Sequence, residues 1–275
     1  MRLQKIYIIG FVLLLLGCTR DNEVALIYLD TNGITIKCDS SANVGDTYEV
    51  NGVTYTIVDE DILREMVAQG ADVTTVCTSK VTNMSDLFFN TEFNQDISSW
   101  DVSNVTNMET LFLASLFDQD ISPWDVTNVT NMGSMFTASP FNQDISAWDV
   151  RNVEDMNQMF SFTQFNQDIS SWDVSNVTNM FGMFWFSTFD QNIEDWNVRG
   201  VRDMYGMFSS SKFNQDISDW DTGNVYNMDE MFRNSQFNQD ISSWNVNNVT
   251  QCELFSDNTP NWTLPKPNFT NCDPN

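Results

Sequence analysis

Residues 93–108 read FNQDISSWDVSNVTNM, and close copies of this stretch return along the chain at a fixed interval of 24 residues. Each copy opens on a phenylalanine: Phe93, Phe117, Phe141, Phe165, Phe189, Phe213 and Phe237. A constant period of this size, without insertions, is typical of a solenoid, in which each unit is too small to bury its own apolar face and must stack on its neighbours. We therefore expect residues 81–256 to form a stack of similar coils.

Apolar residues recur at equivalent positions of successive units, which predicts a core made of ladders. The columns begin at Phe93, Ile97, Trp100, Val105 and Met108, and Cys252 takes the methionine position in the last unit. Burial of a large apolar side chain contributes about 1.5–3 kcal/mol, so several per coil are enough to hold the stack. The seven repeat tryptophans are expected to lie in single file.

Two local patterns alternate within each unit. Residues 93–100 are flanked by turn formers and are interpreted as an extended rung, which would pair with the next rung as a parallel sheet about 4.8 Å apart. Val105, Met108 and Leu111 or Phe112 then follow helical spacing, with Ser103 or Asp101 as a candidate N-cap. The predicted fold is an α/β repeat of strand–short helix coils.

Both ends of the stack need a cover. Residues 26–80 are predicted to form a small α+β N-terminal cap, with strands at 34–37, 48–50 and 54–58, a hairpin turn at Asn51-Gly52 and a helix at 61–69. Residues 257–275 hold four prolines, which disfavour helix and central strand. This C-terminal cap segment is expected to be extended and pinned by Cys272.

The repeat resembles that of BspA-like leucine-rich-repeat bacterial surface proteins, in a variant rich in tryptophan and methionine. The resemblance covers residues 81–255, and GDTYEVNGVTYTIVDEDILREMVAQG at 45–70 is similar to the segment that often precedes such repeats. It implies a right-handed leucine-rich-repeat-like solenoid on a cell surface, associated with adhesion or partner binding. Asn192, Gly200 and Thr222 depart from the column residues of the repeat.

The N-terminus reads as an export signal. Arg2 and Lys5 precede a short apolar run that is too short to span a bilayer, and the run closes on LLGC at 15–18. The tetrad resembles a bacterial lipoprotein box, which implies cleavage after residue 17, lipid on Cys18 and a tether at 18–25; the alternative is a plain secretory signal with a chance cysteine. We expect a lipid-anchored protein of the bacterial envelope, displayed on the outer membrane surface.

Four cysteines remain after lipidation, one pair on each side of the repeats. The economical pairing is Cys38 with Cys77 and Cys252 with Cys272, and the sequence leaves the other two connectivities open. A zinc site is not expected, because the chain has no histidine and no close cysteine spacing.

The chain is strongly acidic, with a net charge of −26 that becomes −28 once residues 1–17 and their two basic groups are removed. Nucleic acid and anionic lipid heads are therefore not expected as partners, since phosphate binding depends on clustered Lys and Arg. Histidine is absent, which removes the commonest general base. The acids lie in repeated columns, whereas a catalytic pair would be singular, so we expect no enzyme activity.

Three polar columns begin at Gln95, Asp96 and Asn104. The amides are interpreted as structural groups that satisfy backbone atoms coil after coil. Aspartates one coil apart repel each other, so either turn capping or a bound cation must offset the repulsion. Turn capping is the preferred reading; calcium held between coils is the alternative, although no EF-hand-type loop supports it.

Function is expected where the repeats differ. Aromatic residues gather in the central three units: Phe162, Phe181, Trp185, Phe186 and Tyr205. Phe162 and Phe186 stand where earlier units carry alanine, and are expected to fill the core. Phe181, Trp185 and Tyr205 are the candidate partner-binding residues.

The sequence thus predicts a non-enzymatic, monomeric, surface-displayed binding or adhesion module without cofactor, whose protein or glycan ligand the sequence does not name. The alternatives are a structural envelope or spacer protein without a specific ligand, and a glycan-binding accessory lipoprotein. The glycan alternative requires the central aromatics to form a flat exposed platform.

Overall fold

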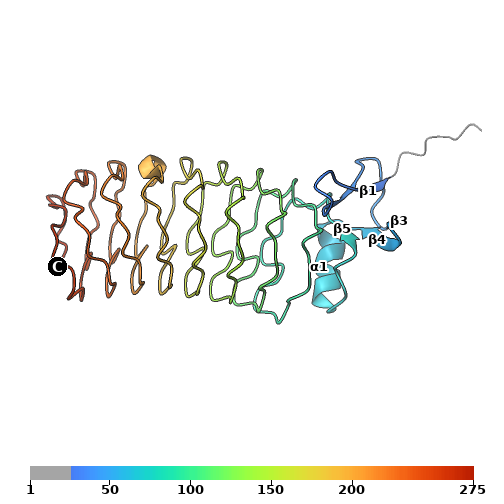
Figure 1. Cartoon of the computed structure of the whole chain (residues 1–275), viewed down its shortest axis with the longest axis horizontal. Helices are drawn as coiled ribbons and strands as arrows, with labels where there is room; N and C mark the ends of the chain where they lie inside the picture. Colours follow the sequence, from blue (N-terminus) through green and yellow to red (C-terminus); the bar gives the residue numbers. More distant parts are fainter. Residues whose placement is uncertain (1–25) are drawn as a thin grey trace, which may run out of the picture.

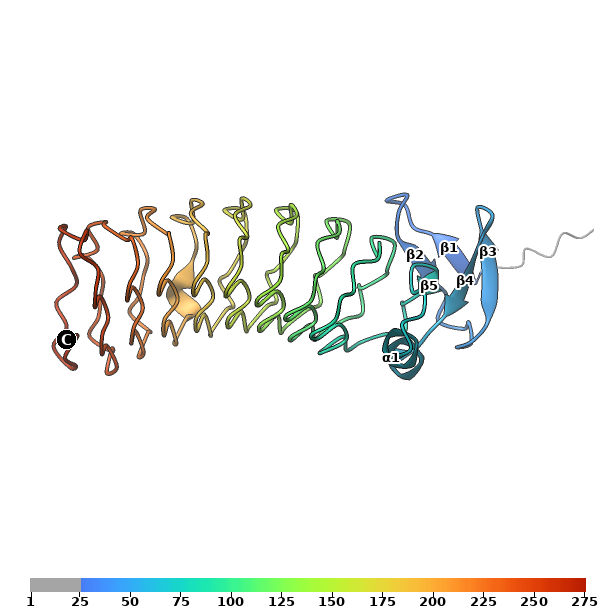
Figure 2. The same ribbon diagram turned by 90° about the horizontal axis from the view of Figure 1, so that it is seen from below.

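The computed structural model describes residues 26–275, so the predicted signal peptide, the lipidation site Cys18 and the tether lie outside the described residues. Figure 1 shows a single elongated stack of coils, with an α+β unit at one end and the C-terminus at the other. The turned view of Figure 2 shows the same succession of coils side by side along one axis. The predicted tandem solenoid is confirmed.

The N-terminal unit contains five short strands and one α-helix within residues 26–77. They are β1 (Ile27–Leu29), β2 (Ile36–Cys38), β3 (Thr47–Val50), β4 (Val53–Ile57), α1 (Glu60–Ala68) and β5 (Val76–Cys77). β1 pairs antiparallel with β2, while β4 lies between antiparallel β3 and parallel β5. No helix in residues 26–275 is long and apolar enough to cross a lipid bilayer.

Local chemistry explains these elements. Asn51 and Gly52 both adopt positive φ, at 53° and 84°, as a two-residue hairpin turn requires. Asp59 caps α1 by accepting a hydrogen bond from the backbone N–H of Ile62. The Glu60 carboxylate accepts from the N–H groups of Thr82 and Asn83, which anchors α1 on the first coil.

The predicted helix at Val105 to Phe112 is wrong. This segment and its equivalents form overlapping turns, in which Leu111 N–H donates to Met108 O while Met108 N–H donates to Asn131 O in the next coil. A residue with positive φ, such as Thr110 at 57°, recurs within these turns. Successive turns repeat apolar residues at nearly helical spacing. They also leave alternate backbone N–H and C=O groups free to form hydrogen bonds between coils, whereas a helix would use these groups internally.

The predicted parallel sheet at residues 93–100 is also misplaced. Parallel bridges join the coils in another column, from Asn83↔Asn107 through to Asn227↔Gln251, as single isolated pairs. In residues 93–100 the coils are joined by side chains; the N–H of Asp118 donates to Asn94 Oδ1 at 3.0 Å. Residues 81–275 therefore contain one short 3₁₀ turn, Val198–Gly200, as their only named helix or strand.

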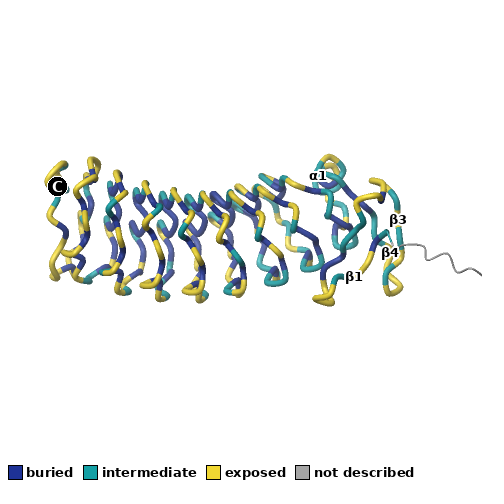
Figure 3. The backbone as a smooth tube through the Cα atoms, turned by 90° about the horizontal axis from the view of Figure 1, so that it is seen from above, coloured by how far each residue is buried: buried dark blue, intermediate teal, exposed yellow. Residues whose placement is uncertain are grey.

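The core is a set of stacked columns, as predicted. Phe112 stacks on Phe117 within its coil at 3.9 Å between ring centroids, and on Phe136 in the next coil at 5.7 Å. The seven repeat tryptophans are buried, and Trp100 and Trp124 stack with planes 5° apart. Figure 3 shows the buried stretches recurring in register from coil to coil, with exposed stretches at the bends.

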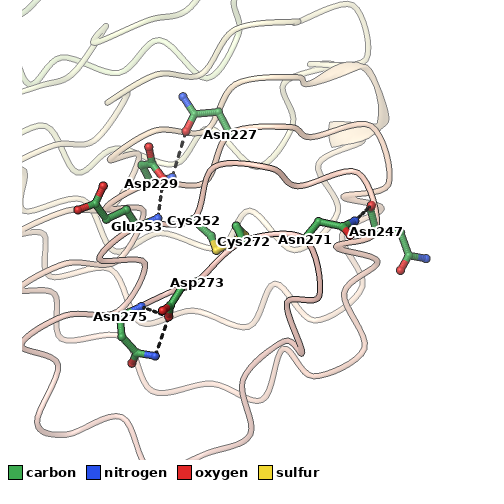
Figure 4. The surroundings of a disulfide bond; sticks show 9 residues. All are labelled: Asn227, Asp229, Asn247, Cys252, Glu253, Asn271, Cys272, Asp273 and Asn275. Carbon is green, nitrogen blue, oxygen red and sulfur yellow. Dashed lines mark hydrogen bonds between the residues drawn. A yellow bond between two sulfur atoms is a disulfide. The ribbon is translucent and has the colours of Figure 1, made fainter.

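The C-terminal tail closes the stack as an extended segment. Trp262 packs edge-on against Phe232 and Phe237, at 5.2 and 4.9 Å between centroids, and so ends the stacked series. Its indole N–H donates to Gln239 O at 3.1 Å. The predicted Cys252–Cys272 disulfide is present and fastens the tail to the last coil (Figure 4).

Candidate functional site

The overlapping turns stack into one surface, which we call the turn face. It consists of residues 83–90, 107–114, 131–138, 155–162, 179–186, 203–210, 227–234 and 251–258. Its four central segments, 131–138 to 203–210, carry only two charged residues, Asp155 and Asp203. Both carboxylates accept backbone N–H bonds two residues ahead, at 2.8 Å, and so cap their turns. The other four segments, two at each end of the turn face, all carry acidic residues.

Three aromatic side chains in this central band form a cluster, the aromatic patch: Phe162, Trp185 and Phe186. The rings of Phe162 and Phe186 stack with planes 8° apart and centroids 4.9 Å apart. Trp185 leans against both, 5.5 Å from Phe162 and 5.7 Å from Phe186. Phe162 and Phe186 are each 49% exposed, and Trp185 is half-buried. The patch is thus an ordered apolar cluster that faces solvent.

The prediction that Phe162 and Phe186 fill the core is wrong, and the backbone explains why. Both have positive φ, at 55° and 52°, and the turn directs their side chains outward. Other units place Asn90, Ser210 or Asn234 in this column, residues that are polar or tolerate the left-handed region. That column composition was the available sequence signal for an exposed position.

The three predicted contact residues do not form one group. Phe181 and Tyr205 stack on each other, 4.8 Å apart and 9° from parallel, and both are half-buried. Burial, followed by the charge of Glu230 and a hydrogen bond with it, raises the pKa of the Tyr205 phenol. Trp185 instead belongs to the aromatic patch. The structure therefore gives an aromatic pair beside a patch, where the sequence suggested a trio.

The predicted glutamine and asparagine columns hold the coils together. Gln143 Nε2 donates to Asp118 O at 3.1 Å, and Asn128 Nδ2 donates to Ser103 O at 2.7 Å, each one coil back. Gly200 interrupts the asparagine column because a Cβ there would lie 2.9 Å from Ser175 O. These amides are structural, as expected.

The aspartate column caps turns, which is the preferred interpretation of the sequence over a bound calcium ion. Asp168 Oδ1 accepts from the N–H of Ser170 at 2.9 Å, and its equivalents bond in the same way. These bonds from Ser170 lower the pKa of Asp168. Within residues 26–275 no group of three or more acidic or cysteine side chains is arranged to hold a metal ion.

One column of side-chain hydrogen-bond acceptors, which join successive coils, was missed from the sequence. Asn94, Asp118 and Asn142 each accept the backbone N–H of the matching residue in the following coil, and the column continues in this way to Asn214. The sequence signal was the restriction of this column to Asn and Asp, since both side chains offer the same Oδ1 acceptor.

The second predicted disulfide is not formed in this structure. Cys38, half-buried, and Cys77, fully buried, are free thiols. They nevertheless lie close together at the ends of β2 and β5, where both cysteines bond to Ser79.

The fold and this surface define a repeat protein whose units are specified by aromatic stacking and side-chain ladders. Three overlapping stretches, residues 60–165, 115–211 and 161–263, match the family described as Mycoplasma protein of unknown function, DUF285. The chain belongs to this family. No curated protein and no solved structure matches it.

Proposed function

We propose that this protein is a non-enzymatic binding or adhesion module that engages a protein partner through the aromatic patch. The observation that carries the proposal is the patch itself. Exposed phenylalanine at positive φ is unfavourable on two counts, since the apolar ring meets water and the backbone is strained by about 1–2 kcal/mol per residue. Other units of the same chain avoid the first cost with Ala, Ser or Asn, although every unit shares the positive φ in this column. The exposed, stacked rings are therefore what sets these two units apart, and an exposed apolar cluster is characteristic of an interaction site.

The charge distribution supports a partner of defined chemistry. The chain carries −26 overall, yet the central turn face has only the two capping aspartates. A second copy of the chain, or a phosphate-rich polymer, would meet net repulsion on approach. A protein whose contact surface is apolar at its centre and neutral or basic at its rim would meet no such repulsion. The protein is accordingly proposed to act as a monomer.

The glycan alternative is less well supported. Sugar rings favour a flat aromatic platform, whereas Phe162 and Phe186 cover one face of each other and Trp185 is tilted by 54° from Phe162. The patch therefore presents ring edges and an angled indole. The spacer alternative leaves an ordered apolar cluster in an acidic protein without a role.

The site of action is proposed from the chain's N-terminus and from its resemblance to BspA-like surface proteins. An export signal and a lipoprotein box at Cys18 would place the repeats outside the cell, anchored in the envelope through lipid alone. The Cys252–Cys272 disulfide is compatible with an oxidising compartment.

The test compares two variants of the purified chain on protein and glycan arrays. Phe162→Ala, Trp185→Ser and Phe186→Ala are combined in one variant, which uses residues found in the same columns of other units. Phe89→Ser with Leu116→Gln is the matched control, since both side chains are more than 50% exposed and lie away from the patch.

We expect the patch variant to keep its melting temperature and to lose the protein signals, at least tenfold, while the control retains them. Protein signals that survive in the patch variant would refute the assigned surface. Signals on glycans alone, lost with the patch, would establish the glycan alternative. An absence of any signal on either array would favour the spacer.

A further inference from the structure

The free cysteines lie on either side of one hydroxyl group at the junction between the N-terminal unit and the first coil. Cys77 Sγ is 3.5 Å from Ser79 Oγ and donates to Ile36 O at 3.7 Å. The backbone N–H of Cys38 donates to the same Ser79 Oγ at 3.0 Å. Cys38 also packs against the buried cluster that contains Cys77. They are therefore close enough to react with each other after small side-chain rotations.

The two thiols differ in access. Cys38 is half-buried and lines a cavity of about 330 Å³ together with Lys37, Asp39 and Lys80. Cys77 has no exposed surface. A disulfide reagent entering from solvent can therefore reach Cys38 and cannot reach Cys77.

The two thiols also differ in acidity. A hydrogen bond from Cys77 is the largest cause that lowers the pKa of Cys38 to about 7, and Ser79 and the charge of Lys80 add to it. The same bond and burial raise the pKa of Cys77. Since the thiolate is the nucleophile, Cys38 is the member of the pair that is prepared to attack near neutral pH.

We propose that Cys38 and Cys77 form a thiol–disulfide exchange site, in which Cys38 attacks a small-molecule or protein disulfide and Cys77 resolves the product. In the first step the Cys38 thiolate forms a bond to one sulfur of the substrate disulfide, whose S–S bond breaks and whose other sulfur leaves as a thiolate. In the second step Cys77 loses its proton and attacks Cys38 Sγ, which expels the second substrate thiolate. The protein is oxidised by two electrons, and the substrate disulfide is reduced to two thiols.

Closure of this bond joins β2 to β5 within the N-terminal unit, at its junction with the first coil. Cys38 ends β2, whose Ile36 N–H already donates to Ser99 O in the first coil at 2.8 Å. Cys77 ends β5, directly before the first coil. A covalent link between these two strands restricts the unfolded chain and so stabilises the cap. The two cysteines are not linked in this structure, and the oxidised state is the one expected outside the cell.

The test uses the full chain with Cys18→Ser, treated with oxidised glutathione and mapped by peptide mass spectrometry. Wild-type Cys38 and Cys77 should become linked to each other, without retained glutathione. Cys77→Ser should accumulate glutathione on Cys38, because the resolving thiol is missing, and Cys77→Ala provides the same trap in case serine alters the packing. Cys38→Ser should leave Cys77 unmodified.

Two further readouts separate this site from an accidental pair. Alkylation of Cys38 should begin at a lower pH in wild type than in the Cys77→Ala chain, which lacks the hydrogen bond that lowers the pKa of Cys38. Oxidation should raise the melting temperature of wild type but of neither single variant. The proposal is overturned if glutathione remains on wild-type Cys38, if Cys77 is modified equally fast without Cys38, or if neither thiol reacts in the folded chain.

Discussion

The indole N–H of Trp148 donates to the backbone carbonyl of Ile121, one coil earlier, across 3.2 Å. The same carbonyl also accepts the N–H of Trp124 at 3.1 Å, so each tryptophan joins two coils at a carbonyl that is already used within the first. Equivalent indole bonds run from Trp100 to Trp244. The tryptophan column therefore sets the register of neighbouring coils through hydrogen bonds, in addition to burying apolar surface.

Replacement of Trp148 by phenylalanine should destabilise the solenoid. Loss of one buried hydrogen bond costs about 0.5–1.5 kcal/mol, and the smaller ring leaves a cavity that adds to the loss. Denaturant unfolding measures the change. Trp185→Phe is the matched control, because this indole is half-buried on the turn face, and its change should stay near zero. Equal losses of unfolding free energy in both variants would show that the tryptophan column does not stabilise the stack through these bonds.

Replacement of Phe162 and Phe186 together by asparagine should stabilise the protein. Each phenylalanine holds a positive φ, which costs about 1–2 kcal/mol for most side chains and less for Asn. The stacked pair that is lost contributes about 0.5–1.5 kcal/mol, which is smaller than the combined relief. Thermal unfolding should show a rise in melting temperature. Phe89→Asn removes a ring that is 51% exposed without positive φ, and should give no rise.

Acid should selectively weaken the aspartate turns. Hydrogen bonds from Ser146 and Ser170 lower the pKa values of Asp144 and Asp168 below 3.8. A lowered folded-state pKa means that the stabilisation is present above pH 3.8 and is lost as the pH falls through the folded value. Asn192 already caps the equivalent turn at 2.9 Å, so Asp144→Asn with Asp168→Asn should keep the turns at every pH.

Melting temperatures of wild type and this double variant, recorded from pH 7 to pH 2, provide the check. Wild type should lose stability relative to the variant below about pH 4. Parallel curves over the whole range would show that the carboxylate charge contributes nothing at these turns.

The stacking of the coils and the identity of the core columns follow from the sequence because the period is constant. Phe93, Ile97, Trp100 and Met108 recur in register, and only a stack brings such positions together. The path of the chain within a coil does not follow in the same way. Overlapping turns and a helix both place Met108 and Leu111 three residues apart on one side, and apolar spacing does not distinguish a positive φ at Thr110 from a helical one.

The candidate site was predicted in part for the same reason. Trp185 is a candidate from the sequence because most other units carry a small or polar residue in its column, and the structure places it in the patch. Phe162 and Phe186 were assigned to the core by size, whereas backbone geometry at their column decides that they face outward. Contacts between side chains of different coils, such as the pairing of Phe181 with Tyr205, depend on that geometry as well.

Removal of the Cys252–Cys272 disulfide should loosen the C-terminal end and leave the rest of the stack unchanged. The bond joins residues separated by 20 positions, for which the chain-entropy estimate is about 3 kcal/mol. Cys252 lies buried in the methionine column, so Cys252→Met with Cys272→Ser restores the column residue while it removes the bond (Figure 4). Because each coil contacts only its neighbours, the effect should remain local. Hydrogen exchange should speed up in residues 251–275 and stay unchanged in residues 93–200. Faster exchange along the whole solenoid would mean that the stack unfolds as one cooperative unit anchored at this end.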